Sequence, residues 1–159
     1  MIVGSVAEVI GRQRRQLGHF LRGEAETVGD RTVDAVQRHT PIGRIVDPMT
    51  GADKGPSGKL RKSWRAQRVR RTAGGYESGA YTTLDYAVFV NDGTRKHVIH
   101  GKQTLRFWSG GTLSFYRSVK HPGTEGHFMA QKGVADIDRE WATEGEVRLQ
   151  AFIERTGRT

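Results

Sequence analysis

Residues 63–83 read SWRAQRVRRTAGGYESGAYTT, and this stretch decides the fold class. From Leu60 to Val69, apolar side chains alternate imperfectly with basic ones, which indicates a short turn followed by a strand from about Ser63 to Arg71. Ala73-Gly74-Gly75 is typical of a turn, and residues 76–83 favour a second strand. The two segments together predict an antiparallel hairpin.

Weaker strand signals continue toward the C-terminal half. Residues 97–100 are typical of a brief strand, and residues 104–108 and 113–119 flank Ser109-Gly110-Gly111 as the arms of a second hairpin. Between the hairpins, the apolar residues 85–90 form a short element that is either a helix or a strand. The sheet is therefore expected within residues 59–120.

Helical patterns lie on both sides of this region. Apolar residues recur mostly three or four positions apart in residues 1–39 and again in residues 125–155, which predicts a helix at each end. Three internal glycines each disfavour the first helix by about 1 kcal/mol relative to alanine. We therefore expect two helices or one bent helix there, ending at Thr40-Pro41 because a residue before proline avoids the helical region.

The order helix, hairpins, helix predicts an α+β fold, with a small antiparallel sheet of hairpins packed by an N-terminal and a C-terminal helix. The chain has 159 residues, so a single domain over residues 1–159 is expected. Residues 41–58 contain three of the four prolines and four glycines, and they predict a long loop before the sheet.

Charge is the strongest signal in the composition. The chain has 26 Lys and Arg against 17 Asp and Glu, a net charge of +9. Both helical ends are nearly balanced, whereas residues 54–71 hold eight basic and no acidic side chains. This stretch is a candidate contact surface for phosphates or for an acidic protein surface, although a solvated face that only confers solubility is the other interpretation. Its basic residues are Lys54, Lys59, Arg61, Lys62, Arg65, Arg68, Arg70 and Arg71.

Several protein classes are excluded by composition. The chain has no cysteine, which excludes disulfide scaffolds, thiolate zinc sites and cysteine nucleophiles. No apolar run approaches the roughly 18 residues of a membrane span, so no membrane partner is expected. The first residues lack the basic region and apolar core of a signal peptide, and we expect the chain to be made and to fold in a reducing cytoplasm.

Catalytic motifs are also missing. Gly58-Lys59 and Gly101-Lys102 both fail the phosphate-loop pattern, and neither G-x-S-x-G nor H-E-x-x-H occurs. Residues 97–127 contain four histidines, but two of them, His97 and His100, would point to opposite faces of one strand. Few carboxylates lie near them in the sequence, and structural or surface histidines are favoured. The sequence thus predicts no enzyme, no metal and no cofactor.

Three motifs occur in an order that resembles a known family. The first is Thr40-Pro41, followed by residues 58–64, GKLRKSW; the second is residues 86–94, YAVFVNDGT; the third is His121-Pro122-Gly123-Thr124. Together they resemble the tail-completion, or head–tail joining, proteins of long-tailed lambdoid bacteriophages, over about residues 30–155. Residues 42–57 stretch the usual first motif, and Asn91-Asp92 departs from the usual second one.

The resemblance assigns fold-forming roles to a set of motif residues. Glycine suits three of these positions because they need a positive φ or a tight turn. The set comprises Pro41, Gly58, Leu60, Ser63, Tyr86, Ala87, Gly93, Thr94, His121, Pro122 and Gly123.

The resemblance further implies a structural virion protein at the head–tail junction, acting as a ring subunit. Its partners would be sister copies, neighbouring neck, tail-terminator or tail-tube proteins, and DNA in the lumen of the ring. The basic stretch and the 41–58 loop are the candidate contacts. Two other functions stay open on the residues alone: a basic nucleic-acid-binding protein, and a small histidine- or metal-dependent nuclease.

Overall fold

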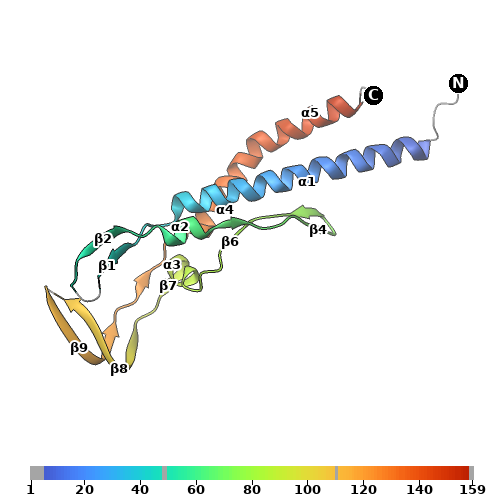
Figure 1. The fold of residues 1–159 in the computed structure, drawn as a ribbon. Helices are drawn as coiled ribbons and strands as arrows, with labels where there is room; N and C mark the ends of the chain where they lie inside the picture. Colours follow the sequence, from blue (N-terminus) through green and yellow to red (C-terminus); the bar gives the residue numbers. More distant parts are fainter. Residues whose placement is uncertain (1–5, 48–49, 110, 158–159) are drawn as a thin grey trace. The chain divides into compact units, whose positions relative to one another are not determined.

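The computed structural model describes residues 6–47, 50–109 and 111–157 (Figure 1). Helices and antiparallel strand pairs alternate along the chain, which confirms the α+β class. Contacts between Cα atoms divide the chain into two compact units. Unit 1 comprises Met1–Arg38, Trp64–Tyr81 and Gln131–Thr159, and unit 2 comprises His39–Ser63 and Thr82–Ala130.

The first helix, α1 (Val6–His39), is one continuous helix of 34 residues. The two-helix alternative is therefore wrong. Two of its glycines lie where other parts of unit 1 approach closely: a Cβ at Gly29 would collide with the Ser78 side chain, and one at Gly18 would lie 3.6 Å from the Tyr76 hydroxyl. Tertiary contacts thus offset the low helix propensity of glycine at these positions.

The C-terminal segment forms α4 (Met129–Glu140), the π-helical turn η1 (Trp141–Gly145) and α5 (Glu146–Gly157), which follow one another without a break. A Cβ at Gly145 would collide with the Trp141 ring, so glycine allows the wider turn to close over that indole. The helix expected over residues 125–155 is confirmed, with its start at Met129.

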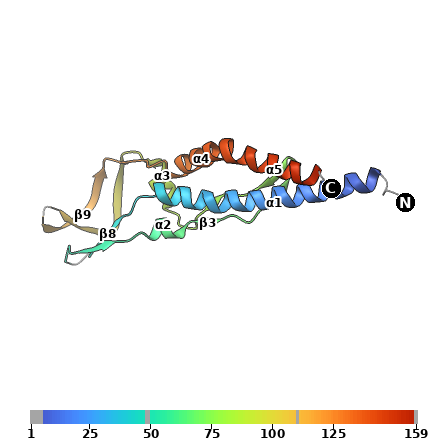
Figure 2. The ribbon, with the colours of Figure 1, turned by 90° about the horizontal axis from the view of Figure 1, so that it is seen from above.

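The two terminal helical segments pack against each other in unit 1, where α1 and α5 lie side by side (Figures 1 and 2). The rings of Phe20 and Phe152 stack with their centroids 4.5 Å apart. Arg148 Nε donates a hydrogen bond to a Glu24 carboxylate oxygen at 3.0 Å. Further along α1, Val36 is 2% exposed and lies against the buried Gly133 of α4.

Unit 1 also contains the first predicted hairpin. It is confirmed as two antiparallel pairs: β3 (Arg65–Ala66) with β6 (Ala80–Tyr81), and β4 (Arg70–Thr72) with β5 (Gly75–Glu77). Trp64, directly before β3, is buried.

Unit 2 begins with an element that the sequence does not reveal. Residues 41–58 contain a hairpin, β1 (Arg44–Val46) paired with β2 (Asp53–Pro56), where a long loop was expected. Pro56 is compatible with this pairing because it lies at the end of a strand that has only one neighbour. A short helix, α2 (Lys59–Ser63), follows and buries Leu60.

The rest of unit 2 consists of α3 (Ala87–Asp92), β7 (Gly93–Thr94), β8 (His97–Ser109), β9 (Thr112–His121) and β10 (Thr124–Glu125). The apolar element at residues 85–90 is thus a helix. The second hairpin is confirmed and extended, since β8 pairs with β9 from His97↔His121 to Ser109↔Thr112.

Among the described residues the strands form five separate two-stranded sheets rather than one continuous sheet. No helix in this part of the chain is both long and apolar enough to cross a membrane.

Candidate assembly surfaces

The second and third sequence motifs meet in unit 2. β7, which ends the second motif, pairs with β10, which ends the third, in the register Thr94↔Thr124. Gly93 and Gly123 have φ angles of +76° and +95°, and a Cβ at either position would collide with the backbone of the opposite motif. Their predicted left-handed conformation is therefore confirmed, and the close pairing explains why a side chain does not fit.

Asn91 joins the second motif to the start of α4. Its Oδ1 accepts a hydrogen bond from the Ala130 backbone N–H at 3.0 Å, and its backbone carbonyl accepts one from Phe128 at 2.9 Å. The side-chain bond satisfies one of the backbone donors left free at a helix N-terminus. The motif residues thus serve as a clamp between elements about 40 positions apart in the sequence.

Arg61 joins the two parts of the first motif. Its Nε and one terminal nitrogen donate hydrogen bonds to the Thr40 carbonyl, at 3.0 and 2.7 Å. The Thr40-Pro41 corner is thereby tied to α2, and Ser63 at the end of α2 hydrogen-bonds to Thr82 at 2.6 Å. Arg61 consequently has a structural role besides the contact role that its charge suggests.

The eight basic residues of 54–71 are divided equally between the two units. Lys54, Lys59, Arg61 and Lys62 lie in unit 2, and Arg65, Arg68, Arg70 and Arg71 lie in unit 1. Two of them form ion pairs within the chain: Lys54 with Asp47 at 2.7 Å, and Arg70 with Glu77 at 2.6 Å. Lys59, Arg68 and Arg71 have no ion-pair partner among the described residues.

A second basic surface was missed by sequence reasoning. We call it the arginine groove: a cavity of about 330 Å³ in unit 1, lined by Arg14, Arg15, Arg22 and Arg71 together with Gly18 and Tyr76. Three of these arginines come from α1. The numbers of basic and acidic residues in this helix are nearly equal, so its net charge does not reveal the basic face. Arg15 and Arg22 are seven residues apart, and helical spacing therefore places them on one face of α1. This spacing is the sequence signal that could have identified the basic face.

Large apolar side chains are exposed in both units. On α1 they are Val9, Ile10, Leu17 and Leu21. On the β8–β9 hairpin they are Val98, Ile99, Phe115 and Tyr116, of which Phe115 is 62% exposed. A two-stranded hairpin is marginally stable in water by itself, so this long arm is a candidate contact surface.

The hairpin β1–β2 is held by an exposed ion pair between Arg44 and Asp53. The Arg44 guanidinium lowers the pKa of Asp53, and a hydrogen bond from the Gly55 backbone N–H lowers this pKa further. The hairpin also approaches β8, since a Cβ at Gly51 would lie 2.9 Å from the Trp108 ring.

Two of the histidines lie close together across the β8–β9 hairpin. His97 and His121 are cross-strand neighbours with ring centroids 5.1 Å apart, and His121 Nδ1 accepts the Gly123 N–H at 3.1 Å. Within the described residues, no group of three or more His, Cys, Asp or Glu is placed to hold a metal ion.

A comparison with protein-family models matches residues 13–93 to the family described as "Bacteriophage HK97-gp10, putative tail-component". The matched range covers half of the chain and includes α1 from residue 13 onward, the first hairpin and the first two motifs as far as Gly93. The chain belongs to this tail-component family.

Membership in the HK97-gp10-like family confirms the resemblance inferred from the motifs. The protein is therefore a structural component of a bacteriophage tail and is associated with the virion. The third motif lies beyond the matched range, yet Glu125, directly after it, pairs with the last matched residue, Gly93. No curated protein and no solved structure matches the chain.

Proposed function

We propose that this tail component acts at the head–tail junction, where copies of the chain form a ring that completes the tail or joins it to the head. A ring requires a heterologous contact, in which one surface of a subunit binds a different surface of the next and the rotation closes.

The observation that carries this proposal is the amount of surface that the folded chain leaves exposed. Its accessible surface is 12261 Å². Even two independent compact domains with this combined mass would expose only about 9,600 Å², from the usual scaling of surface with mass. An accessible surface above this value is typical of a subunit that buries more surface in an assembly.

The side chains on the exposed surface are of the types that form contacts between subunits. Apolar side chains are exposed along α1 and along the β8–β9 hairpin, and large exposed apolar patches mark interaction sites. The net charge of +9 adds a preference for acidic neighbouring surfaces, and it is also compatible with DNA passing through a ring.

Depletion of the chain from the parent phage tests this role. Without it, we expect filled heads and complete tail tubes to accumulate separately, and addition of the purified chain to an extract should restore joined particles. Normal yields of infectious particles without the chain would contradict the proposal, and so would the absence of any tail tube.

A further inference from the structure

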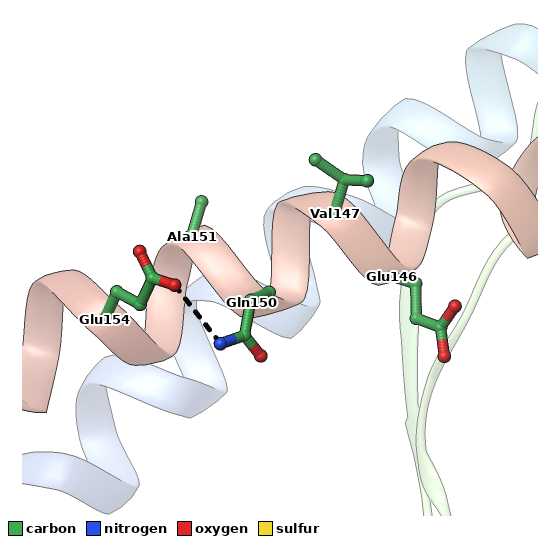
Figure 3. Close-up of a pocket in the computed structure, with 5 residues that line it drawn as sticks. All are labelled: Glu146, Val147, Gln150, Ala151 and Glu154. Carbon is green, nitrogen blue, oxygen red and sulfur yellow. Dashed lines mark hydrogen bonds between the residues drawn. The ribbon is translucent and has the colours of Figure 1, made fainter.

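Unit 1 carries two surfaces of opposite charge whose charged residues have the same spacing along a helix. The first is the arginine groove described above. The second, which we call the α5 acidic face, is the side of α5 formed by Glu146, Val147, Gln150, Ala151 and Glu154 (Figure 3).

The α5 acidic face has the make-up of a contact surface. All five residues are exposed, and Val147 is 68% exposed. Val147 and Ala151 point to the same side of the helix in Figure 3, whereas Glu146 points to the opposite side. Glu146 and Glu154 form no ion pair with a described residue, although Gln150 Nε2 donates a hydrogen bond to Glu154 at 3.2 Å. Exposed apolar side chains next to carboxylates without an ion-pair partner are compatible with a protein contact surface.

The arginine groove lacks an internal counter-charge. No carboxylate of the described residues pairs with Arg14, Arg15 or Arg71, and Arg22 alone has a partner, Glu26 at 3.3 Å on the same helix. Converging guanidinium groups favour an anionic occupant, with the planar geometry that suits carboxylates.

The spacing of charges agrees between the two surfaces. Glu146 and Glu154 are eight residues apart, and so are Arg14 and Arg22, which corresponds to about 12 Å along each helix. The midpoints are Gln150 and Gly18. At the centre of the groove, a Cβ at Gly18 would lie 3.6 Å from the Tyr76 hydroxyl, so Tyr76 borders the groove there and the arginines flank it.

We propose that the α5 acidic face of one copy binds the arginine groove of the next copy. The inference rests on the proposed ring and names its subunit contact. The two surfaces are different parts of one unit, so the contact is heterologous and generates a closed ring when the rotation allows it. A second copy is favoured over DNA as the occupant of the groove. One contact between copies pairs the arginines of the groove with the carboxylates of the α5 acidic face, whereas DNA would pair with the arginines alone.

Cross-linking in purified virions tests this contact directly, since the chain has no cysteine of its own. The double variant G18C/Q150C places one thiol at each midpoint, and Gly18 has room for a side chain. Under mild oxidation we expect a ladder of disulfide-linked multimers that collapses to monomer on reduction. The matched control G18C/D138C keeps the groove thiol but moves the second thiol to an exposed position of α4, and it should give no ladder.

Charge reversal provides a second measurement. The variant E146R/E154R should lower the yield of joined particles about tenfold or more, since the loss of about 1.4 kcal/mol of contact free energy gives that factor. The variant R14E/R22E, which reverses the two arginines that have the same spacing, should do the same. Combining the four substitutions restores complementary charges and should recover most of the yield.

The outcomes separate this inference from the proposed function. The chain can be present at the junction while the double-cysteine variant gives no ladder and the combined charge variant recovers no yield. That result overturns the inference and leaves the proposed ring unaffected. The inference is also overturned if no ladder forms and the chain binds duplex DNA in a salt-sensitive way that R14E/R22E abolishes, since the groove would then be a DNA site. Absence of the chain from the particle overturns both.

Discussion

Gly93 and Gly123 hold two motifs together because neither carries a side chain. Both have a positive φ, and both lie against the backbone of the opposite motif. We expect Gly93→Ala and Gly123→Ala to lower the free energy of unfolding by about 1–3 kcal/mol each, the cost of a strained conformation with a collision. Chemical denaturation followed by circular dichroism measures this loss.

Gly43→Ala is the matched control in the same unit. Gly43 has no atom within 4 Å of a Cβ and lies outside the positive-φ glycines, so alanine there should leave stability unchanged or slightly raised. Equal effects of all three substitutions would contradict the proposed clamp.

Asp53 gives a pH dependence with a defined sign. Its lowered pKa, caused first by Arg44 and then by the Gly55 N–H, means that the ionised form is favoured in the folded hairpin. The resulting stabilisation is present above about pH 3.9, the ordinary value for aspartate, and is lost as the pH falls through the folded pKa. In an NMR titration, the Asp53 carboxyl carbon should show a midpoint below 3.9, and Arg44→Ala should return it to the ordinary value. A midpoint at or above 3.9 in the unaltered chain would contradict the ion pair.

Residue type alone predicted some of these features and not others. The left-handed conformation of Gly58, Gly93 and Gly123 follows from the chemistry of glycine in short motifs, and the structure confirms it. The bond from Asn91 to Ala130 spans 39 positions, and no local pattern specifies such a pairing. Arg61 was recognised as a charge, but its bonds to Thr40 depend on the corner that Pro41 introduces.

At the scale of elements, the packing of α1 on α5 depends on the stacked pair Phe20 and Phe152. We expect Phe152→Ala to lower the free energy of unfolding by about 3 kcal/mol, because it removes a buried ring and leaves a cavity. Thermal unfolding should show a clear drop in the melting temperature. Ile153→Ala, at the next position but 51% exposed, should cost less than about 1 kcal/mol. Similar effects of the two substitutions would mean that α5 does not pack through this face.

The sequence predicted which segments are helices and which are strands better than it predicted whether a helix is interrupted. Apolar spacing identified both terminal helices and both hairpins, since periodicity reports which face is buried. The glycines of α1 suggested a break that close contacts with the β4–β5 region make unnecessary. Residues 41–58 were expected as a loop because proline and glycine dominate them, although Arg44 and Asp53 stabilise a hairpin there.

For the whole molecule, the sequence identified a basic tail component but only part of its basic surface. A count of charges along the chain identified residues 54–71 as basic. It did not identify the N-terminal helix, because the numbers of basic and acidic residues there are nearly equal. Folding brings Arg71 to Arg14, Arg15 and Arg22, which are more than 45 positions away. A charge count within a window cannot show this, because the groove forms between elements that are distant in the sequence.

Cryo-microscopy of the intact virion tests the central claim most directly. The account predicts closed-ring density at the head–tail junction into which copies of unit 1 and unit 2 fit, with α5 of each copy against α1 of the next. Absence of this chain from both the junction and the tail would contradict it.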